Sequence, residues 1–403
     1  MTTWPRVTLG DLCEIQIGRT PARAEARYWG PGHKWLSIAD MAQGRDIVAT
    51  TETITDAAVR ECGCKVVRAG TLVFSFKLSI GKVGFVRTDM YTNEAIAALT
   101  IRNAQRADPL YLYRALQALD LSGVGERAVK GLTLNTRSVS ELPVPLPPLS
   151  DQRWIAATLD KADAILHKQH ESLPQLDAFL RSAFFAMFGD SLTNSMRWDT
   201  ARLQDVCTRI TVGHVGPMTT EYRAAGIPFL RSLNVRRSLV DQTDLKFVSP
   251  AFHSKLSKSL LRPFDVVSVR TGKPGVSAVI PASLGEANCA DLIVLSCGAR
   301  LRPDYLCEVL NQRLGDRETI QGSTGAVQTH FNIGRARDMV VPVPPLDIQE
   351  RFACIVDAAM LLRSKLDRAQ ATAEELFLAL QWELFRSGSL ASRRWEGRCE
   401  EAP

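Results

Sequence analysis

Two short glycine-rich segments of this sequence carry residues that could do chemistry. Gly81-Lys82 and Gly272-Lys273 each place a lysine directly after a glycine. In a nucleotide-binding P-loop the lysine is followed by Ser or Thr, whose hydroxyl binds the metal ion of the nucleotide. Here Val83 and Pro274 follow instead. The two segments therefore do not predict a nucleotide-hydrolysing site.

Other catalytic and metal-binding signatures are also missing from the sequence. The six histidines form no HExxH motif, no GxGxxG follows a predicted strand, and the Asn-Pro-Pro-aromatic segment typical of amino-methyltransferases does not occur. We recognise no nuclease-like cluster of Asp, Glu and Lys. The nine cysteines are scattered, and Cys62 and Cys64 are too close for a zinc ribbon. The sequence thus predicts binding surfaces without a catalytic or metal centre.

Positive charge is concentrated in two long blocks of the chain. Residues 1–141 carry a net charge of +4 and residues 191–340 a net charge of +6, whereas 142–190 and 341–403 each carry −2. Phosphate contacts dominate non-specific affinity for nucleic acids, so each basic block is suited to a polyanion. A solvated basic surface without a partner remains an alternative on charge alone.

Length and composition indicate a folded protein of several domains. A chain of 403 residues suits two or three domains, and 45% apolar with 23% charged residues is typical of globular proteins. The first ten residues lack the apolar core of a signal peptide, and no apolar run approaches the ~18 residues of a membrane span. We therefore expect a cytoplasmic protein with thiols in a reducing compartment.

An internal repeat organises the chain. The run Val-Pro-Leu-Pro-Pro-Leu at 144–149 returns as Val-Pro-Val-Pro-Pro-Leu at 341–346, an offset of 197 that continues through Gln152 and Gln349. The two basic blocks match at an offset of 194, for example Trp4 with Trp198. Arg394-Trp395 repeats Arg197-Trp198, so the last residues begin a third copy. The order is therefore block, helix, block, helix, with the tail expected to pack near the first block.

Each proline run leads into a predicted helix of about 40 residues, or roughly 60 Å at 1.5 Å per residue. Ser150 or Asp151 is expected to cap the first helix and Asp347 the second. Gln169 is a polar residue in the first apolar stripe, and Pro174 predicts a kink or a helix restart. Apolar residues alternate at spacings of three and four, which is the pattern of a coiled-coil seam. The seam residues are Leu159, Ala162, Leu166, Leu173, Leu176 and Leu180 in the first helix, and Ile355, Ala359, Leu362, Leu366, Leu376 and Leu380 in the second.

These patterns predict an α+β fold. Two mixed α/β domains are separated by two long antiparallel coiled-coil helices, and the repeat gives the chain a pseudo-two-fold symmetry. A zipper between two copies of the chain is the alternative use of the same stripes. The expected parts are a first domain (1–141), a connector with the first helix (142–190), a second domain (191–340), a connector with the second helix (341–388) and a tail (389–403).

The repeated segments resemble one known family. A proline-rich run followed by Gln152, Ile155 and a long helix is similar to the conserved regions of the DNA-specificity subunits of Type I restriction–modification systems. The opening Leu9-Gly10-Asp11-Leu12, with Gly18-Arg19-Thr20-Pro21, also resembles that family. Two positions depart from its pattern in the second repeat: Ile348 stands where the first repeat has Asp151, and the Gly-x-Thr-Pro segment becomes 213–217.

The resemblance implies a non-catalytic subunit of a larger enzyme. Each basic block would be a target-recognition domain that reads one half of a bipartite, asymmetric sequence in double-stranded DNA. The helices would set the spacer and dock two modification (methyltransferase) subunits, which restriction subunits join. S-adenosylmethionine, ATP and magnesium would belong to those partners, and this chain would hold no cofactor.

Candidate DNA contacts are polar or basic residues on predicted loops, because base edges are read by hydrogen bonds and phosphates by Lys and Arg. Lys82 and Lys273 stand out, since their glycine-rich turns allow close approach to a DNA backbone. The candidates in the first domain are Arg19, Thr20, Lys77, Ser79, Lys82 and Lys130. Those in the second are Arg231, Ser232, Asn234, Arg236, Arg237, Arg270, Lys273 and Thr324.

Two functions of other classes remain open on the sequence alone. The chain is an enzyme if a nuclease or methyltransferase site has diverged beyond recognition. It is a scaffold if the basic blocks bind protein or RNA and the helices only assemble. Turnover by the lone chain with Mg²⁺ or S-adenosylmethionine identifies the first, and competition between duplex DNA and RNA identifies the second.

Overall fold

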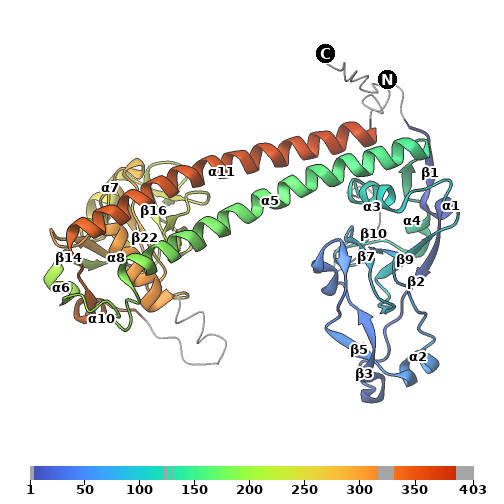
Figure 1. Ribbon diagram of the computed structural model, residues 1–403, viewed down its shortest axis with the longest axis horizontal. Coiled ribbons are helices and arrows are strands. Elements are labelled where there is room, and N and C mark those ends of the chain that lie inside the picture. Colours follow the sequence, from blue (N-terminus) through green and yellow to red (C-terminus); the bar gives the residue numbers. More distant parts are fainter. Residues whose placement is uncertain (1–3, 122–125, 129–130, 316–330, 387–403) are drawn as a thin grey trace, which may run out of the picture. The chain divides into compact units, whose positions relative to one another are not determined.

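The computed structural model describes residues 4–121, 126–128, 131–315 and 331–386. The chain divides into two compact units (Figure 1). The first contains the described residues up to His170 together with those from Ala369 onward, and the second runs from Glu171 to Arg368. Each unit therefore contains one predicted recognition domain and a part of each long helix.

The first unit is built on a five-stranded sheet in the order β2-β9-β6-β7-β4. Its central strand, Leu72–Ser75, is buried throughout, as expected for a continuous apolar run. A three-stranded sheet, β5-β3-β8, and the pairs β1-β12 and β10-β11 complete the domain. The strands are β1 Arg6–Thr8, β2 Cys13–Ile17, β3 Trp29–Leu36, β4 Asp46–Ile47, β5 Glu52–Ile54, β6 Leu72–Ser75, β7 Val83–Val86, β8 Tyr91–Thr92, β9 Ile96–Ile101, β10 Glu126–Ala128, β11 Gly131–Thr133 and β12 Pro143–Pro145.

The first domain also contains short helices, and the long helix α5 (Leu149–Phe188) follows it in the chain. Asp108 caps α3 by accepting the backbone N–H groups of Leu110 and Tyr111 at 2.9 and 3.0 Å. Within this unit α3 lies beside α5, while β3, β5 and α2 lie at the end away from it (Figure 1). The helices are α1 Leu9–Leu12, α2 Asp56–Cys62, α3 Pro109–Gln117 and α4 Thr136–Ser140.

The second unit repeats this plan with different sheet sizes. A four-stranded sheet, β14-β24-β21-β22, packs on α8 through β21 and β22. The domain also contains a five-stranded sheet in the order β15-β19-β16-β23-β20. The strands are β13 Thr200–Arg202, β14 Cys207–Val212, β15 Tyr222–Arg223, β16 Ile227–Leu230, β17 Val235–Arg236, β18 Leu239–Val240, β19 Lys246–Val248, β20 Leu260–Leu261, β21 Val266–Val269, β22 Ser277–Val279, β23 Ala287–Cys289, β24 Leu292–Cys297 and β25 Val340–Pro342. The helices are α6 Leu203–Val206, α7 Pro250–Lys255, α8 Pro303–Leu310, α10 Ile333–Asp338 and α11 Leu346–Arg386.

The long helices α5 and α11 pair side by side and antiparallel in each unit. In the second unit the Phe184 ring meets the Phe352 ring at 5.3 Å, and Leu176 and Leu180 pack against Ala359. In the first unit His170 is hydrogen-bonded to Gln370 at 3.1 Å. There Leu159 shares an apolar cluster with residues close to the end of α11. The predicted pairing of the two helices within one chain is confirmed.

The register predicted for α11 is wrong at two positions. Leu362 and Leu376 are 46% and 64% exposed, so neither lies in the seam. Arg363 turns inward instead and pairs with Asp177, and Phe377 packs against the core of the first unit. A helix with 3.6 residues per turn places successive residues on different faces. In α11 the residues that face inward, Arg363 and Phe377, are those that follow the two predicted leucines. Ile355, Ala359, Leu366 and Leu380 lie in apolar clusters at the helix pair.

The expected beginnings of the long helices also need correction. α5 begins at Leu149 and α11 at Leu346, so Ser150, Asp151 and Asp347 lie in the first turns and not at the caps. Acidic residues there interact favourably with the helix dipole. α5 is one continuous helix that contains Pro174, so no restart occurs.

The beginning of the first domain contacts the end of α11. The Trp4 indole donates to the Leu384 carbonyl at 3.1 Å, so the end of α11 lies at the beginning of the first domain. The tail at 389–403 lies outside the described residues.

Across the part of the chain that the structure describes, no helix is both long and apolar enough to span a membrane.

Candidate DNA interface

The same tight turn follows the central strand of both domains. In the first domain the Gly81 N–H donates to the Ser75 carbonyl at 2.9 Å, and in the second the Gly275 N–H donates to the Val269 carbonyl at 2.9 Å. The backbone is left-handed at matching positions, with φ of +64° at Leu78 and +89° at Gly272. Glycine accepts this conformation readily, whereas leucine is strained in it. The repeat therefore places one loop geometry twice, with different side chains.

Each turn is tied to the helix that precedes the proline run. The Leu134 N–H donates to the Phe76 carbonyl at 3.0 Å, and the Phe331 N–H donates to the Arg270 carbonyl at 3.3 Å. The next residue is an asparagine that caps a short helix, Asn135 in the first unit and Asn332 in the second. The turns are thus held by backbone bonds from both sides.

The first turn carries three of the candidate residues. Lys77 is half-buried, with its ammonium 5.4 Å from the centre of the Phe76 ring, and Ser79 is exposed. Lys82 donates to the Ile38 carbonyl at 3.1 Å. These lysines have hydrogen-bonding capacity beyond those contacts, since an ammonium has three donors. The turn therefore presents positive charge beside an exposed hydroxyl.

Arg19 and Thr20 lie together on a neighbouring loop of the first unit. The Arg19 guanidinium donates to the Cys62 carbonyl at 2.9 Å. The Thr20 hydroxyl donates to the carboxylate of Glu94. Arg19 is exposed, and its loop is held by the Trp35 indole, which donates to the Arg19 carbonyl at 3.0 Å.

Three candidates of the second unit, half-buried Arg231 and Ser232 and exposed Arg236, lie in the segment that ends with β17. Arg231 pairs with Asp244 and Arg236 pairs with Asp241, at 2.8 and 2.7 Å. The Thr243 hydroxyl and backbone, followed by Arg236, hold the pKa of Asp241 at about 2. Exposed ion pairs are worth little, so an exposed arginine can exchange a carboxylate for a phosphate at small cost. Ser232 is partly exposed.

Two neighbouring candidates, on either side of β17, serve the fold instead. Asn234 is 2% exposed: its side-chain oxygen accepts the Arg231 N–H at 3.0 Å and its amide donates to two backbone carbonyls. In the first unit Asp40 accepts the Ser37 N–H in the same way, at 2.9 Å. Arg237 forms a salt bridge with Glu308, which is 6% exposed. A base edge cannot reach the Asn234 amide, and moving Arg237 would strand a buried carboxylate. We therefore withdraw both as DNA contacts.

Around the second turn, Lys273 is exposed and Arg270 lies 3.5 Å from the Asp291 carboxylate. The Thr271 hydroxyl also donates to Asp291, and Ser232 lies close by. The structure thus brings Arg270, Ser232 and the second turn together. Lys130 and Thr324 lie outside the described residues.

An acidic position shared by both domains and two exposed leucines were not predicted from the sequence. The Asn93 N–H donates to the Leu36 carbonyl at 3.1 Å, and the Ala290 N–H donates to the Leu230 carbonyl at 2.9 Å. Glu94 and Asp291 come directly after these two donors, beside the ends of β3 and β16. A carboxylate can accept from the amino group of cytosine. Leu78 and Leu233 are 66% and 75% exposed within the candidate loops. The signal in the sequence was an apolar residue among Gly, Ser, Lys and Arg.

Both domains are anchored to the long helices by the same contacts. Gln152 accepts the Asp108 N–H at 2.8 Å, and Gln349 accepts the Arg302 N–H at 2.8 Å. The Tyr111 hydroxyl donates to a proline carbonyl at 2.7 Å, and that of Tyr305 does so at 3.0 Å. These bonds link each recognition domain to the start of a long helix. Within the described residues, no group of three or more His, Cys, Asp and Glu side chains is arranged to hold a metal ion.

The comparisons with known proteins agree with the resemblance. Residues 1–175 match the family model described as the Type I restriction modification DNA specificity domain. The chain is 21% identical over 378 residues to the specificity subunit of the Type I restriction enzyme MjaIX of Methanocaldococcus jannaschii, covering 88% of this chain and 86% of that protein. It is 23% identical over 192 residues to the EcoR124I/EcoR124II specificity subunit of Escherichia coli, covering 46% and 47%.

Two solved structures share the fold. One comes from work on assembly and conformational transition of a Type I restriction–modification system, with a TM-score of 0.59, 18% identity, and coverage of 96% of this chain and 98% of that chain. The other is the S subunit of such a system from M. genitalium, with a TM-score of 0.52, 12% identity, and coverage of 95% and 96%. Residues 1–175 thus match the Type I restriction modification DNA specificity domain family, and over most of its length the chain is similar to specificity subunits of Type I restriction enzymes.

Proposed function

We propose that this chain reads two different half-sites of one DNA duplex, one with each domain. The observation that carries the proposal is the repeated turn: one backbone geometry presents Lys77-Leu78-Ser79 in the first unit and Thr271-Gly272-Lys273 in the second. Because base recognition depends on side-chain chemistry, two turns with the same backbone geometry and different side chains read different sequences. The target is then bipartite and asymmetric.

The helices act as the spacer in this proposal. Two readers on one face of B-DNA need centres about one helical turn, ~34 Å, apart or a multiple of that distance. Helices of 40 and 41 residues are about 60 Å long at 1.5 Å per residue, which is sufficient for such a separation. The half-sites are therefore separated by bases that the chain does not read.

Exposed apolar side chains on the long helices are the proposed docking faces for two modification subunits. Large apolar side chains are rarely left in contiguous exposed groups without a partner. On α5 and α11 together the exposed ones are Trp154, Ile165, Phe179, Phe185, Leu346, Leu361, Leu362, Leu376, Leu378 and Trp382. Because the chain is a repeat, two equivalent faces suit two copies of one partner, and restriction subunits join that assembly.

The chain itself is proposed to be non-catalytic and cytoplasmic. S-adenosylmethionine, ATP and magnesium then belong to the partner subunits, and adenine methylation takes place on the methyltransferases. A scan of the lone chain for turnover with each of these compounds separates this proposal from that of a self-contained enzyme.

Duplex binding as a function of salt tests the proposal directly. The chain with its methyltransferase subunit should bind a duplex that contains both half-sites more tightly than a duplex with either half alone. Affinity should fall steeply with salt, because bound phosphates release counterions. Equal affinity for split and single half-sites, or tighter binding of RNA, would contradict it.

A further inference from the structure

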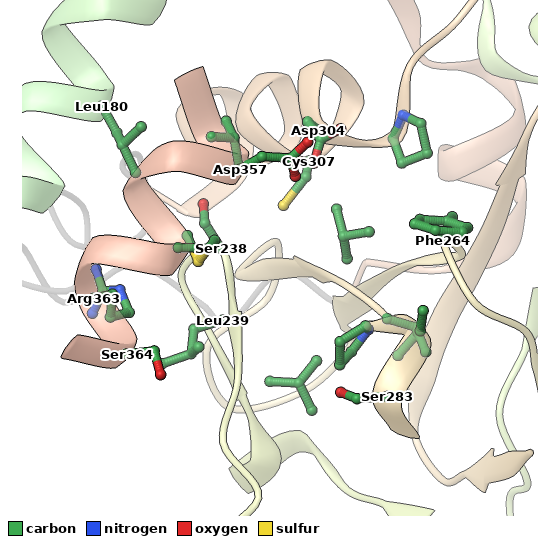
Figure 2. Close-up of a pocket in the computed structure, with 18 of the residues that line it drawn as sticks. Leu180, Ser238, Leu239, Phe264, Ser283, Asp304, Cys307, Asp357, Arg363 and Ser364 are labelled. Carbon is green, nitrogen blue, oxygen red and sulfur yellow. The ribbon is translucent and has the colours of Figure 1, made fainter. Parts of the chain in front are cut away.

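A cavity of about 920 Å³ lies within the second unit, between the recognition domain and the helix α11. In Figure 2, Asp304, Cys307 and Asp357 lie together at one side of it, and Phe264 and Ser283 lie at the other. The volume is in the range of pockets that bind small organic molecules. The proposed reading of DNA makes no use of this cavity.

The first unit shows what occupies the equivalent place there. Arg114 on α3 is 2% exposed, and its guanidinium donates to Asp160 at 2.6 Å and to Asp163 at 2.8 Å, both on α5. The guanidinium also stacks on Tyr113, at 5.2 Å from the ring centre. A second arginine, Arg45, pairs with Asp160 at 2.9 Å. In the first unit the space between the domain and α5 is thus filled by the Arg114 guanidinium, which lies over the Tyr113 ring.

The second unit keeps the carboxylate but has a glutamate at the position of Arg114. Asp357 corresponds to Asp160 at the offset of the helices, whereas Glu308 corresponds to Arg114 and Cys307 to Tyr113 at the offset of the domains. The phenol ring and the guanidinium are therefore both replaced by smaller or oppositely charged groups. The cavity lies where these groups are missing, and Cys307, Glu308 and Asp357 line it.

Asp304 adds a second carboxylate beside Asp357. Burial, together with the negative charge of Asp357, raises the pKa of Asp304, and the positive charge of Arg302 opposes this only in part. Among the described residues no cation lies within ion-pair distance of Asp304 or Asp357. The other charged residues that line the cavity are Arg302, Glu308, Arg363, Asp367 and Arg368. Arg363 pairs with Asp177, Glu308 pairs with Arg237, and Arg368 donates to the Ser364 carbonyl at 3.2 Å.

Much of the remaining wall of the cavity is apolar. It includes Phe264, Val279, Ile280 and Pro281 from the domain and Val356 and Met360 from α11. Phe264 is 61% exposed and has a left-handed φ of +68°, so a bulky side chain is held at the mouth in a strained backbone. An apolar body would cover this wall and remove it from water.

We propose that this cavity binds an organic cation, a guanidinium or ammonium group on an apolar body, with the cation beside Asp304 and Asp357. The bound group would take the place that the Arg114 guanidinium fills in the first unit. Either a free amine or guanidine, or a basic side chain of a protein, carries this chemistry. The inference does not depend on DNA reading, because the ligand meets none of the candidate DNA residues.

Calorimetric titration of the full chain with benzylguanidine tests the proposal, with benzylurea as the neutral probe of nearly the same shape. We expect saturable binding of benzylguanidine and none of benzylurea. Asp357→Asn should weaken binding at least about tenfold, because charge-assisted hydrogen bonds are the strong ones. Glu350→Gln is the matched control: it removes one charge from an exposed position of the same helix outside the cavity, and it should bind like the wild type.

A second arm uses the capped peptide Leu-Arg-Leu. Tighter binding of the peptide than of benzylguanidine assigns the ligand to a protein side chain, and the reverse order assigns it to a free cation. Thermal unfolding of each variant verifies the fold, and Asp304→Asn provides a second loss of charge if Asp357→Asn is unstable. Absence of saturable binding by both probes, or equal binding by the wild type and a folded Asp357→Asn variant, would overturn the proposal.

Discussion

Gln349 makes in the second unit the same three hydrogen bonds that Gln152 makes in the first. Each side-chain oxygen accepts a backbone N–H at 2.8 Å, and each amide donates to two carbonyls at 2.8 to 3.0 Å. Both side chains are fully buried. A buried polar group of this kind fixes the connection between a domain and its helix, because every alternative leaves backbone groups unpaired.

Replacing Gln152 with leucine should therefore destabilise the first unit. The change leaves three backbone groups without a partner, and an unsatisfied buried group costs about 1–3 kcal/mol. We expect a lower midpoint for that unit in scanning calorimetry. Gln105→Leu, at an exposed site of the same domain, should leave the midpoint unchanged. Equal midpoints for the Gln152 variant and the wild type would show that the anchor is dispensable.

Lys273→Ala and Arg237→Ala should distinguish a residue that contacts DNA from a residue that stabilises the fold. Lys273 is exposed on the second turn, so its loss should weaken DNA binding and lower the salt slope by about 1 per phosphate contact. Arg237 neutralises buried Glu308, so its loss should lower stability and leave the salt slope unchanged. Anisotropy titrations at several salt concentrations, with thermal melts, measure both. A lower slope for a folded Arg237→Ala variant would restore that residue to the interface.

Leu78 should be replaceable by glycine without loss of stability. Its backbone is left-handed, a conformation that costs leucine about 1–2 kcal/mol, and its side chain is 66% exposed. We expect Leu78→Gly to unfold at the same temperature as the wild type or higher. Gly272→Ala, at the matching position of the second turn, should be destabilised. If Leu78→Gly is stable and also binds the first half-site less well, the exposed leucine takes part in reading it.

The hydrogen bonds that Asp241 accepts from Thr243, and then from Arg236, predict a pH dependence of stability. The pKa of Asp241 is about 2 in the folded chain, below its ordinary value of 3.8. A carboxyl whose folded pKa is depressed stabilises the fold above its unfolded pKa, and this contribution is lost as the pH falls through about 2. The stability difference between wild type and Asp241→Asn should be present at pH 5 and shrink toward pH 2. A difference that does not change with pH would contradict the assignment.

Periodicity and repetition were sufficient to predict the architecture. Offsets of 194 and 197 require two similar domains and two helices, and strands such as Leu72–Ser75 follow from their apolar runs. The register of α11 was not predictable in the same way. Leu362 and Arg363 are neighbours, and only packing against Asp177 decides which of them turns inward.

Individual loop residues were the least predictable part of the site. Asn234 and Arg236 are polar residues only two positions apart, yet Asn234 is buried and makes three hydrogen bonds whereas Arg236 is exposed. Their roles depend on the path of the backbone, which the sequence does not reveal at this range. Arg114 was missed for a related reason: its burial follows from carboxylates 46 and 49 positions away in the chain.

Sequencing of methylated bases in a host that expresses this chain with its methyltransferase subunit is the most direct test of the central claim. We expect a split motif with methylated adenine, two defined halves and an undefined spacer. Substitutions in the first turn, such as Lys77→Ala with Ser79→Ala, should alter only one half of the motif, and Lys273→Ala only the other. A contiguous motif, or turn variants that alter both halves together, would contradict the claim that each repeat reads its own half-site.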